Sequence, residues 1–187
     1  TDQRGLHHLI YEILDNAVDE AMAGFCDTVK ISMDTEGVIT VVDNGRGIPV
    51  DIHPTTGKTA LETVMTTLHA GGKFGGGAYK VTGGLHGVGG SVVNGLSEHL
   101  RAEVRRDGWT YSQDYEAGIP LGEVEKGEKT EEHGTRIAFK PDQKIFPIID
   151  YDFEVLVSHF KEIAFLNKGL EIQFVSHWHE EARSGDI

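Results

Sequence analysis

Four polar residues near the start of the chain, His8, Glu12, Asn16 and Asp19, are spaced four, four and three positions apart. This spacing places them on one face of a helix. A Glu in this position could orient and deprotonate an attacking water, and a His one turn earlier could hydrogen-bond to that Glu and tune it. The amide oxygen of an Asn is a neutral, hard ligand that suits Mg²⁺ alongside phosphate oxygens. A solvated helix face is the alternative interpretation of the same pattern.

The second candidate is the segment Asp43-Asn44-Gly45-Arg46-Gly47, which follows a predicted strand. A carboxylate at the end of a buried strand could accept a hydrogen bond from the amino group of adenine. Guanine presents an oxygen acceptor at the same place and would be repelled, so a single Asp would give selectivity for adenine. The glycines would let the backbone approach the base closely. An ordinary turn at the end of a strand is the alternative.

The third candidate is a glycine-rich run at residues 83–90, inside a window from Thr63 to Ser97 that contains neither Asp nor Glu. Backbone amides of a glycine-rich loop ahead of a helix form a binding site for phosphate. The run lacks the Gly-Lys-Ser/Thr of a Walker A motif, and no short strand leads directly into it as in a dinucleotide-binding fold. A second glycine cluster at 71–77 predicts a hinged flap over a nucleotide. A disordered linker is the alternative.

Apolar periodicity and turn signals predict the elements that would position these candidates. Helices are predicted over 6–23, 59–68, 91–96 and 152–166. Strands are predicted over 28–33, 38–42, 99–106, 109–116, 135–140 and 170–175, the last being the final strand, and residues 120–133 are predicted to form a polar loop. This order predicts one α+β domain over residues 1–187, a two-layer α/β sandwich with helices on one face of a mixed, mainly antiparallel sheet.

Composition limits the partners of the chain. A net charge of −13 repels phosphate backbones, so this chain is not expected to bind duplex DNA by itself. The single cysteine, Cys26, excludes an internal disulfide framework, fits a cytoplasmic protein and is not expected to be a nucleophile. No apolar run is long enough for a membrane helix, so no membrane partner is expected. His177 and His179 are expected to mark the surface end of a strand, not a metal site.

The order of these features resembles that of the GHKL ATPases, the superfamily of gyrases, chaperones, histidine kinases and mismatch-repair proteins that share the Bergerat fold. Three stretches carry a closer resemblance, to the ATPase subunits of type IIA topoisomerases. They are Glu12-Ile13-Leu14-Asp15-Asn16-Ala17-Val18-Asp19-Glu20-Ala21, Leu68-His69-Ala70-Gly71-Gly72-Lys73-Phe74 and Gly83-Gly84-Leu85-His86-Gly87-Val88-Gly89. The resemblance runs across essentially the whole chain.

The resemblance implies a role for each matching residue. Glu12 would be the general base, supported by His8, and Asn16 the Mg²⁺ ligand. Asp43 would bind the adenine amino group, Arg46 would stack near the adenine, and lysines of the glycine-rich lid would lie near the phosphates. Arg46 would also pair with Glu20. The complete nucleotide-binding set that the resemblance implies is Asn16, Glu20, Asp43, Arg46, Gly47, Ile48, Pro49, Gly71, Gly72, Lys73, Tyr79, Lys80, Gly84, Leu85, His86, Gly87, Val88, Gly89, Gly90 and Thr135.

The resemblance also implies ATP and Mg²⁺ as cofactors and a gyrase B-type ATPase, with the topoisomerase IV counterpart as the near alternative. In that family ATP hydrolysis drives dimer closure and DNA strand passage, and the gyrase A subunit and DNA bind through other domains. The N-terminal arm that dimerises and the transducer domain are missing here, so we expect slow turnover by the fragment. Ser112 replaces an Arg that contacts aminocoumarin-type inhibitors, which implies a changed inhibitor affinity. A histidine-kinase-type phosphotransferase and a non-catalytic nucleotide-binding module are the alternatives from other classes.

Overall fold

A mixed β-sheet runs through the computed structural model, which describes residues 2–68, 89–179 and 183–187. Its strands within those residues are β1 (Thr28–Met33), β2 (Ile39–Asp43), β3 (Ser97–Arg106), β4 (Trp109–Glu116), β5 (Ile119–Pro120), β6 (Glu125–Lys129), β7 (Gly134–Pro141), β8 (Glu171–Ser176) and β9 (Arg183–Asp186). They lie in the order β5-β4-β3-β7-β2-β1-β8-β9, and β6 pairs with β4. Only β1 and β8 pair in parallel; the other described pairs are antiparallel.

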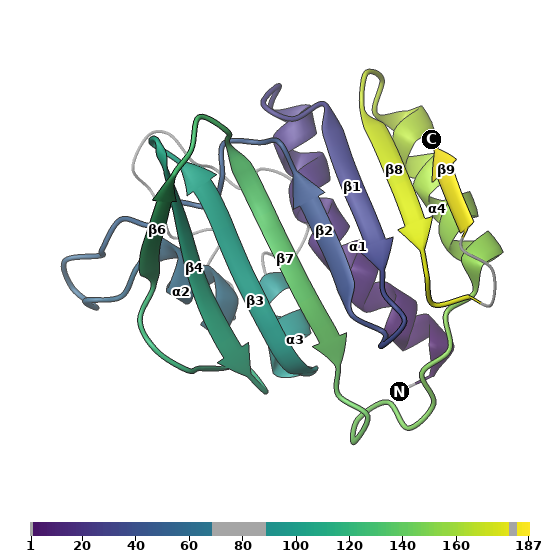
Figure 1. The fold of residues 1–187 in the computed structure, drawn as a ribbon, viewed down its shortest axis with the longest axis horizontal. Helices are drawn as coiled ribbons and strands as arrows, with labels where there is room; N and C mark the ends of the chain where they lie inside the picture. The colour runs from purple at the N-terminus through teal and green to yellow at the C-terminus, as the bar shows by residue number, and fades with distance from the viewer. Residues whose placement is uncertain (1, 69–88, 180–182) are drawn as a thin grey trace.

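Helices cover one face of this sheet (Figure 1). They are α1 (Gln3–Met22), α2 (Ala60–Thr66), α3 (Gly89–Gly95) and α4 (Phe153–Leu166). α1 lies behind β1 and β2, α2 and α3 lie toward the β3–β4 side, and α4 lies behind β8. The predicted two-layer α+β architecture is therefore confirmed.

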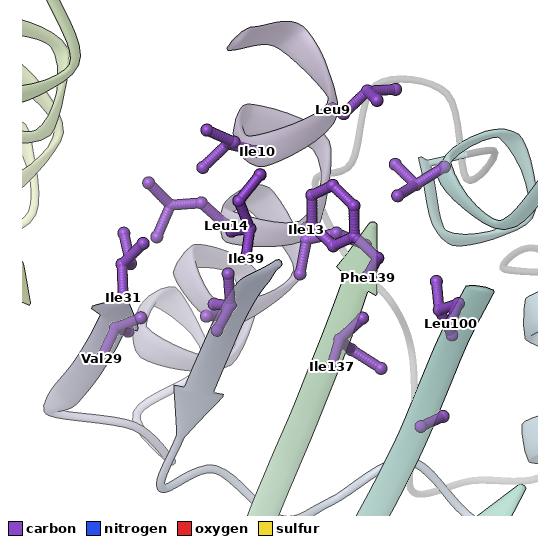
Figure 2. Close-up of a cluster of buried hydrophobic side chains, with 14 of the residues drawn as sticks. Leu9, Ile10, Ile13, Leu14, Val29, Ile31, Ile39, Leu100, Ile137 and Phe139 are labelled. Atoms are coloured by element: carbon purple, nitrogen blue, oxygen red, sulfur yellow. The ribbon is translucent and has the colours of Figure 1, made fainter. Parts of the chain in front are cut away.

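The core forms where the apolar face of α1 meets the sheet. Figure 2 shows Ile10, Ile13 and Leu14 of α1 above side chains from β1, β2 and β7. All three are at most 3% exposed. Full burial of one such side chain is worth about 1.5–3 kcal/mol, so this contact fixes α1 on the sheet. The polar residues between those apolar positions are thereby held at defined places beside the strands.

The observed helices begin and end near their predicted limits, and capping explains where α1 begins. α1 begins at Gln3 instead of residue 6, because the Asp2 side chain accepts a hydrogen bond from the Gly5 amide at 2.9 Å and caps a polar first turn that carries no apolar signal. Thr59 caps α2 in the same way, and α2 ends at Thr66 instead of residue 68. α3 begins at Gly89, two residues earlier than predicted.

Two strand predictions are wrong. The predicted loop 120–133 contains β6, whose five residues are all exposed, so the segment has no apolar alternation from which a strand could be predicted. The predicted final strand is followed by β9, a four-residue strand that pairs antiparallel with β8.

The structure also describes His177, His179 and Cys26, the other residues that the sequence analysis singles out. His177 is exposed, whereas both ring nitrogens of His179 are within hydrogen-bonding distance, 2.7 Å from Ser176 Oγ and 2.8 Å from the Tyr151 carbonyl. The described residues include no group of three His, Cys, Asp or Glu that could hold a metal. Burial raises the pKa of the Cys26 thiol to about 11, so the thiolate is scarce at neutral pH. Within the described part of the chain, no helix has the length and apolarity to cross a membrane.

Candidate active site

A cavity opens between α1 and the middle of the sheet. Its polar lining comes from residues that the sequence predicts for the site, namely Asn16, Glu20, Asp43 and Thr135. Its apolar walls are Ile13, Val41, Ile48, Met65 and Ile137. An apolar lining with a few polar groups is typical of small-molecule sites.

Asp43 ends β2, where it is 9% exposed. Its Oδ1 accepts hydrogen bonds from the Gly45 amide at 2.9 Å and the Thr135 amide at 3.2 Å. Its Oδ2 makes no hydrogen bond to a described residue. Burial is the main cause that raises the pKa of this carboxyl to about 6, against the two amide donors that lower it. Asp43 is thus mainly a carboxylate at neutral pH, with one oxygen fixed by the backbone.

The start of β7 lies directly against the end of β2. Gly134 has a φ of +138°, and a Cβ atom at this position would stand 2.0 Å from the Asp43 carbonyl oxygen. Only glycine allows that approach. The next residue, Thr135, donates its amide to Asp43 and accepts a hydrogen bond on its hydroxyl from the Ile48 amide at 3.1 Å. The Gly-Thr pair therefore ties β7 to the residues that follow β2.

Residues 44–49, the β2 turn, are tied to α1 by an ion pair. Glu20 lies 2.7 Å from Arg46 through Oε1 and Nη2, and its Oε2 also accepts from Arg46 Nε at 3.2 Å. The Arg46 guanidinium carbon lies 4.0 Å from the centroid of the Phe25 ring. The predicted pairing of Arg46 with Glu20 is confirmed. The stacking of Arg46 near adenine stays a prediction.

Glu12 and His8 lie at the other end of the polar face of α1. His8 Nε2 is 2.9 Å from Glu12 Oε1, so the predicted contact between the two side chains is present. The side chain of Glu12 is 21% exposed and that of His8 66%. A Cβ atom on Gly89, the first residue of α3, would stand 2.6 Å from Glu12 Oε2. Glu12 is therefore enclosed on one side by α3, while the His8 side remains open.

Asn16 lies one turn from Glu12 and is half-buried in the cavity wall. Its side-chain amide makes no hydrogen bond to a described residue. A neutral amide oxygen in this position fits one ligand of a Mg²⁺ ion. Since the described residues contain no further cluster of ligands, phosphate oxygens and water would have to complete the coordination.

Part of the predicted set lies outside the described residues, namely Gly71, Gly72, Lys73, Tyr79, Lys80, Gly84, Leu85, His86, Gly87 and Val88. Gly89 and Gly90 are described and begin α3. Gly47 is buried with a φ of +82°, and the half-buried Pro49 follows Ile48. Ser112 lies in β4 opposite Glu103 and Glu125 and is not among the residues that line the cavity.

Sequence reasoning missed the apolar walls contributed by Met65, Val41 and Ile137. These residues occupy ordinary core positions of α2, β2 and β7. Apolar periodicity marks them as buried but cannot distinguish a residue that faces a cavity from one that faces the core. Val41 lies two positions before Asp43 and Ile137 two positions after Thr135, which is their only signal, and Met65 carries none.

Comparison with known proteins agrees with this geometry. The family model described as histidine kinase-, DNA gyrase B- and HSP90-like ATPase matches residues 1–145. The DNA gyrase B protein of Synechocystis sp. is 56% identical over 179 residues, which cover 93% of this chain and 16% of that protein. The DNA gyrase B protein of Thermotoga maritima is 55% identical over 174 residues, 93% of this chain and 27% of that protein.

The protein of the same name from Halalkalibacterium halodurans is 52% identical over 188 aligned positions, 100% of this chain and 29% of that protein. The chain thus spans less than a third of the length of these curated relatives.

The contact between Gly134 and Asp43 predicts an unequal response of two glycines to the same change. Gly134→Ala should destabilise the fold by roughly 3 kcal/mol or more, because a positive φ and a clash with backbone add. Gly108→Ala is the matched control, since Gly108 has a φ of +83° but open space around its Cβ position, and should cost about 1 kcal/mol. Urea unfolding of both variants measures the difference. Equal losses would contradict the close contact.

Proposed function

Because the chain belongs to the family of histidine kinase-, DNA gyrase B- and HSP90-like ATPases, we propose that it binds and hydrolyses ATP as the ATPase domain of a DNA gyrase B-type subunit. The named relatives are gyrase B proteins, which favours this proposal over the topoisomerase IV counterpart. Residues 1–187 form a single GHKL domain in this proposal, and the dimerising arm and the transducer domain belong to other parts of the protein.

The buried carboxylate of Asp43 is the observation that carries the proposal. Its Oδ1 is occupied by two backbone amides, so Oδ2 is the acceptor that remains for a ligand in the cavity. The exocyclic amino group of adenine is a donor of the required kind, and the apolar walls suit the faces of a purine. The backbone around Gly47 and the Thr135 hydroxyl, which accepts a hydrogen bond from the Ile48 amide at 3.1 Å, would complete the contact with the base.

The polar face of α1 supports hydrolysis at the other end of the nucleotide. Glu12 would accept a proton from water as that water attacks the γ-phosphorus, and the bond from phosphorus to the leaving oxygen of ADP would break. His8, 2.9 Å from Glu12, would hold the carboxylate in place. Asn16 would hold Mg²⁺, which, when bound, neutralises charge on the phosphates. The lid residues, with Lys73 and Lys80, would enclose the phosphates.

In the whole protein we propose that ATP binding and hydrolysis drive dimer closure and DNA strand passage, which makes it an ATP-hydrolysing type II DNA topoisomerase of the cytoplasm. The gyrase A subunit and DNA would bind through other domains, as the charge of −13 argues against DNA binding by this one. Aminocoumarin-type inhibitors would occupy the ATP pocket. The isolated domain should bind ATP and turn it over slowly.

Replacement of Glu12, the proposed general base, separates ATP hydrolysis from ATP binding. In a full-length protein, Glu12→Gln should lower the ATP hydrolysis rate by about 100-fold or more, because the amide cannot accept the proton. ATP affinity should stay within about threefold, since Glu12 acts on the attacking water. Steady-state turnover and calorimetric binding measure the two effects, and Glu36→Gln, at an exposed loop position, is the control. Unchanged turnover in Glu12→Gln would favour a non-catalytic nucleotide-binding module.

The raised pKa of Asp43 predicts pH-dependent affinity. The carboxyl is ionised above its pKa of about 6 and protonated below it, so affinity for ADP should fall as the pH falls from 8 through 6 to 5. In Asp43→Asn the side-chain oxygen takes the place of Oδ1 and the amide nitrogen faces the base. This variant should bind ADP about tenfold or more weakly at pH 8, because a donor opposes the adenine amino group.

The difference in affinity between the parent and Asp43→Asn should shrink with falling pH. Titration of the ADP phosphates affects both proteins equally and therefore does not contribute to this difference. A constant difference from pH 8 to pH 5 would contradict the role given to the Asp43 carboxylate.

A further inference from the structure

Two peptide groups of the β2 turn are hydrogen-bonded to side chains from other elements. The first of them joins Gly45 to Arg46. Its carbonyl oxygen on Gly45 lies 2.7 Å from Nδ1 of His133, and its amide on Arg46 donates to Glu20 Oε2 at 2.9 Å. A carbonyl oxygen only accepts, so His133 is the donor. Both polar ends of this peptide group are therefore bound to side chains that come from other elements.

The peptide group that joins Gly47 to Ile48 is held in the same manner. Its carbonyl oxygen on Gly47 accepts a hydrogen bond from Arg106 Nη1 at 2.9 Å, and its amide on Ile48 donates to Thr135 Oγ1 at 3.1 Å. Arg106 ends β3 and has a side chain only 22% exposed. Its Nε also donates to Asp107 at 3.1 Å, which fixes the guanidinium.

These contacts remove the freedom that glycine gives to the β2 turn. A peptide group bound at both its carbonyl and its amide cannot rotate without breaking a hydrogen bond. The Gly47 amide lies between the two fixed groups and makes no hydrogen bond to a described residue. It is therefore a donor of fixed direction, as Asp43 Oδ2 is an acceptor of fixed direction. A preorganised site of this kind binds more tightly than a loose one.

We propose that Arg106 and His133 are positioning residues that hold the β2 turn in the conformation that recognises the base. Neither lines the cavity. Each acts through a carbonyl oxygen of the turn. The proposal rests on the proposed function, because it assumes that the ligand is an adenine nucleotide.

Conservative variants distinguish positioning from general stability. Arg106→Met removes the donor but keeps the length of the chain, and Arg106→Lys keeps one charged donor. His133→Phe removes the Nδ1 donor but keeps a ring, whereas His133→Asn restores an N–H near the position of Nδ1. Arg101→Met is the matched control for lost charge, since Arg101 lies on the same strand and pairs with Asp114 at 2.7 Å.

Calorimetric titration of the variants with ADP and with GDP gives the test. Arg106→Met should weaken ADP binding by about tenfold, as expected for a lost charged hydrogen bond. His133→Phe should weaken it by about threefold, because His133 is exposed and its bond is worth less. Arg106→Lys and His133→Asn should recover most of the affinity. The preference for ADP over GDP should fall with the affinity in Arg106→Met and His133→Phe, and Arg101→Met should match the parent.

The proposal is overturned when Arg106→Met and His133→Phe bind ADP within about twofold of the parent, or when Arg101→Met loses as much affinity as Arg106→Met. If Arg106→Met does not fold, His133→Phe, at an exposed position, decides alone.

Asp43→Asn measured in parallel separates positioning from the proposed function. A parent that binds no ADP, or an Asp43→Asn that binds like the parent, contradicts the proposed function and this proposal together. Weakened Asp43→Asn beside unchanged positioning variants contradicts the positioning alone.

Discussion

A carboxylate removed from water must find hydrogen-bond donors, and the site is arranged around the way in which Asp43 satisfies this requirement. Burial raises its pKa to about 6 even with two backbone amides on Oδ1. Without those amides the pKa of Asp43 would rise further, and near neutral pH the protonated carboxyl would no longer offer a carboxylate acceptor to a base. The two donors come from different segments, Gly45 in the β2 turn and Thr135 in β7. The close pairing of β2 and β7, which only a glycine at 134 permits, is therefore a condition of the proposed base recognition.

The second constraint is that one helix serves both the core and the site. The apolar face of α1 packs on the sheet (Figure 2), and this packing fixes where its polar face lies. Glu20 then meets Arg46 at one end of α1, Asn16 faces the cavity in the middle, and Glu12 meets His8 nearer the N-terminus. Helix geometry sets the distance along α1 between Glu20 and Glu12, so in the proposed function a nucleotide of fixed length would span both ends.

The sequence predicts those parts of this arrangement that depend on local patterns. The periodicity of α1 locates its polar face, and the segment after β2 marks Asp43 as a candidate. Family resemblance adds the pairing of Arg46 with Glu20, which the structure confirms. The exposed strand β6 carries no period and was not predictable. Arg106 and His133 were also missed, because their contacts join residues 59 and 88 positions apart in the chain and follow no local rule.

Recognition of the adenine amino group by Asp43 is the central claim, and the affinity of the 187-residue chain for two matched nucleotides tests it directly. ADP and inosine diphosphate share ribose and phosphates, but inosine carries a carbonyl oxygen where adenine carries the amino group. At pH 8, calorimetry should show ADP bound at least about tenfold more tightly than inosine diphosphate, because an acceptor facing a carboxylate is repelled. Equal affinities for the two nucleotides would contradict this role of Asp43.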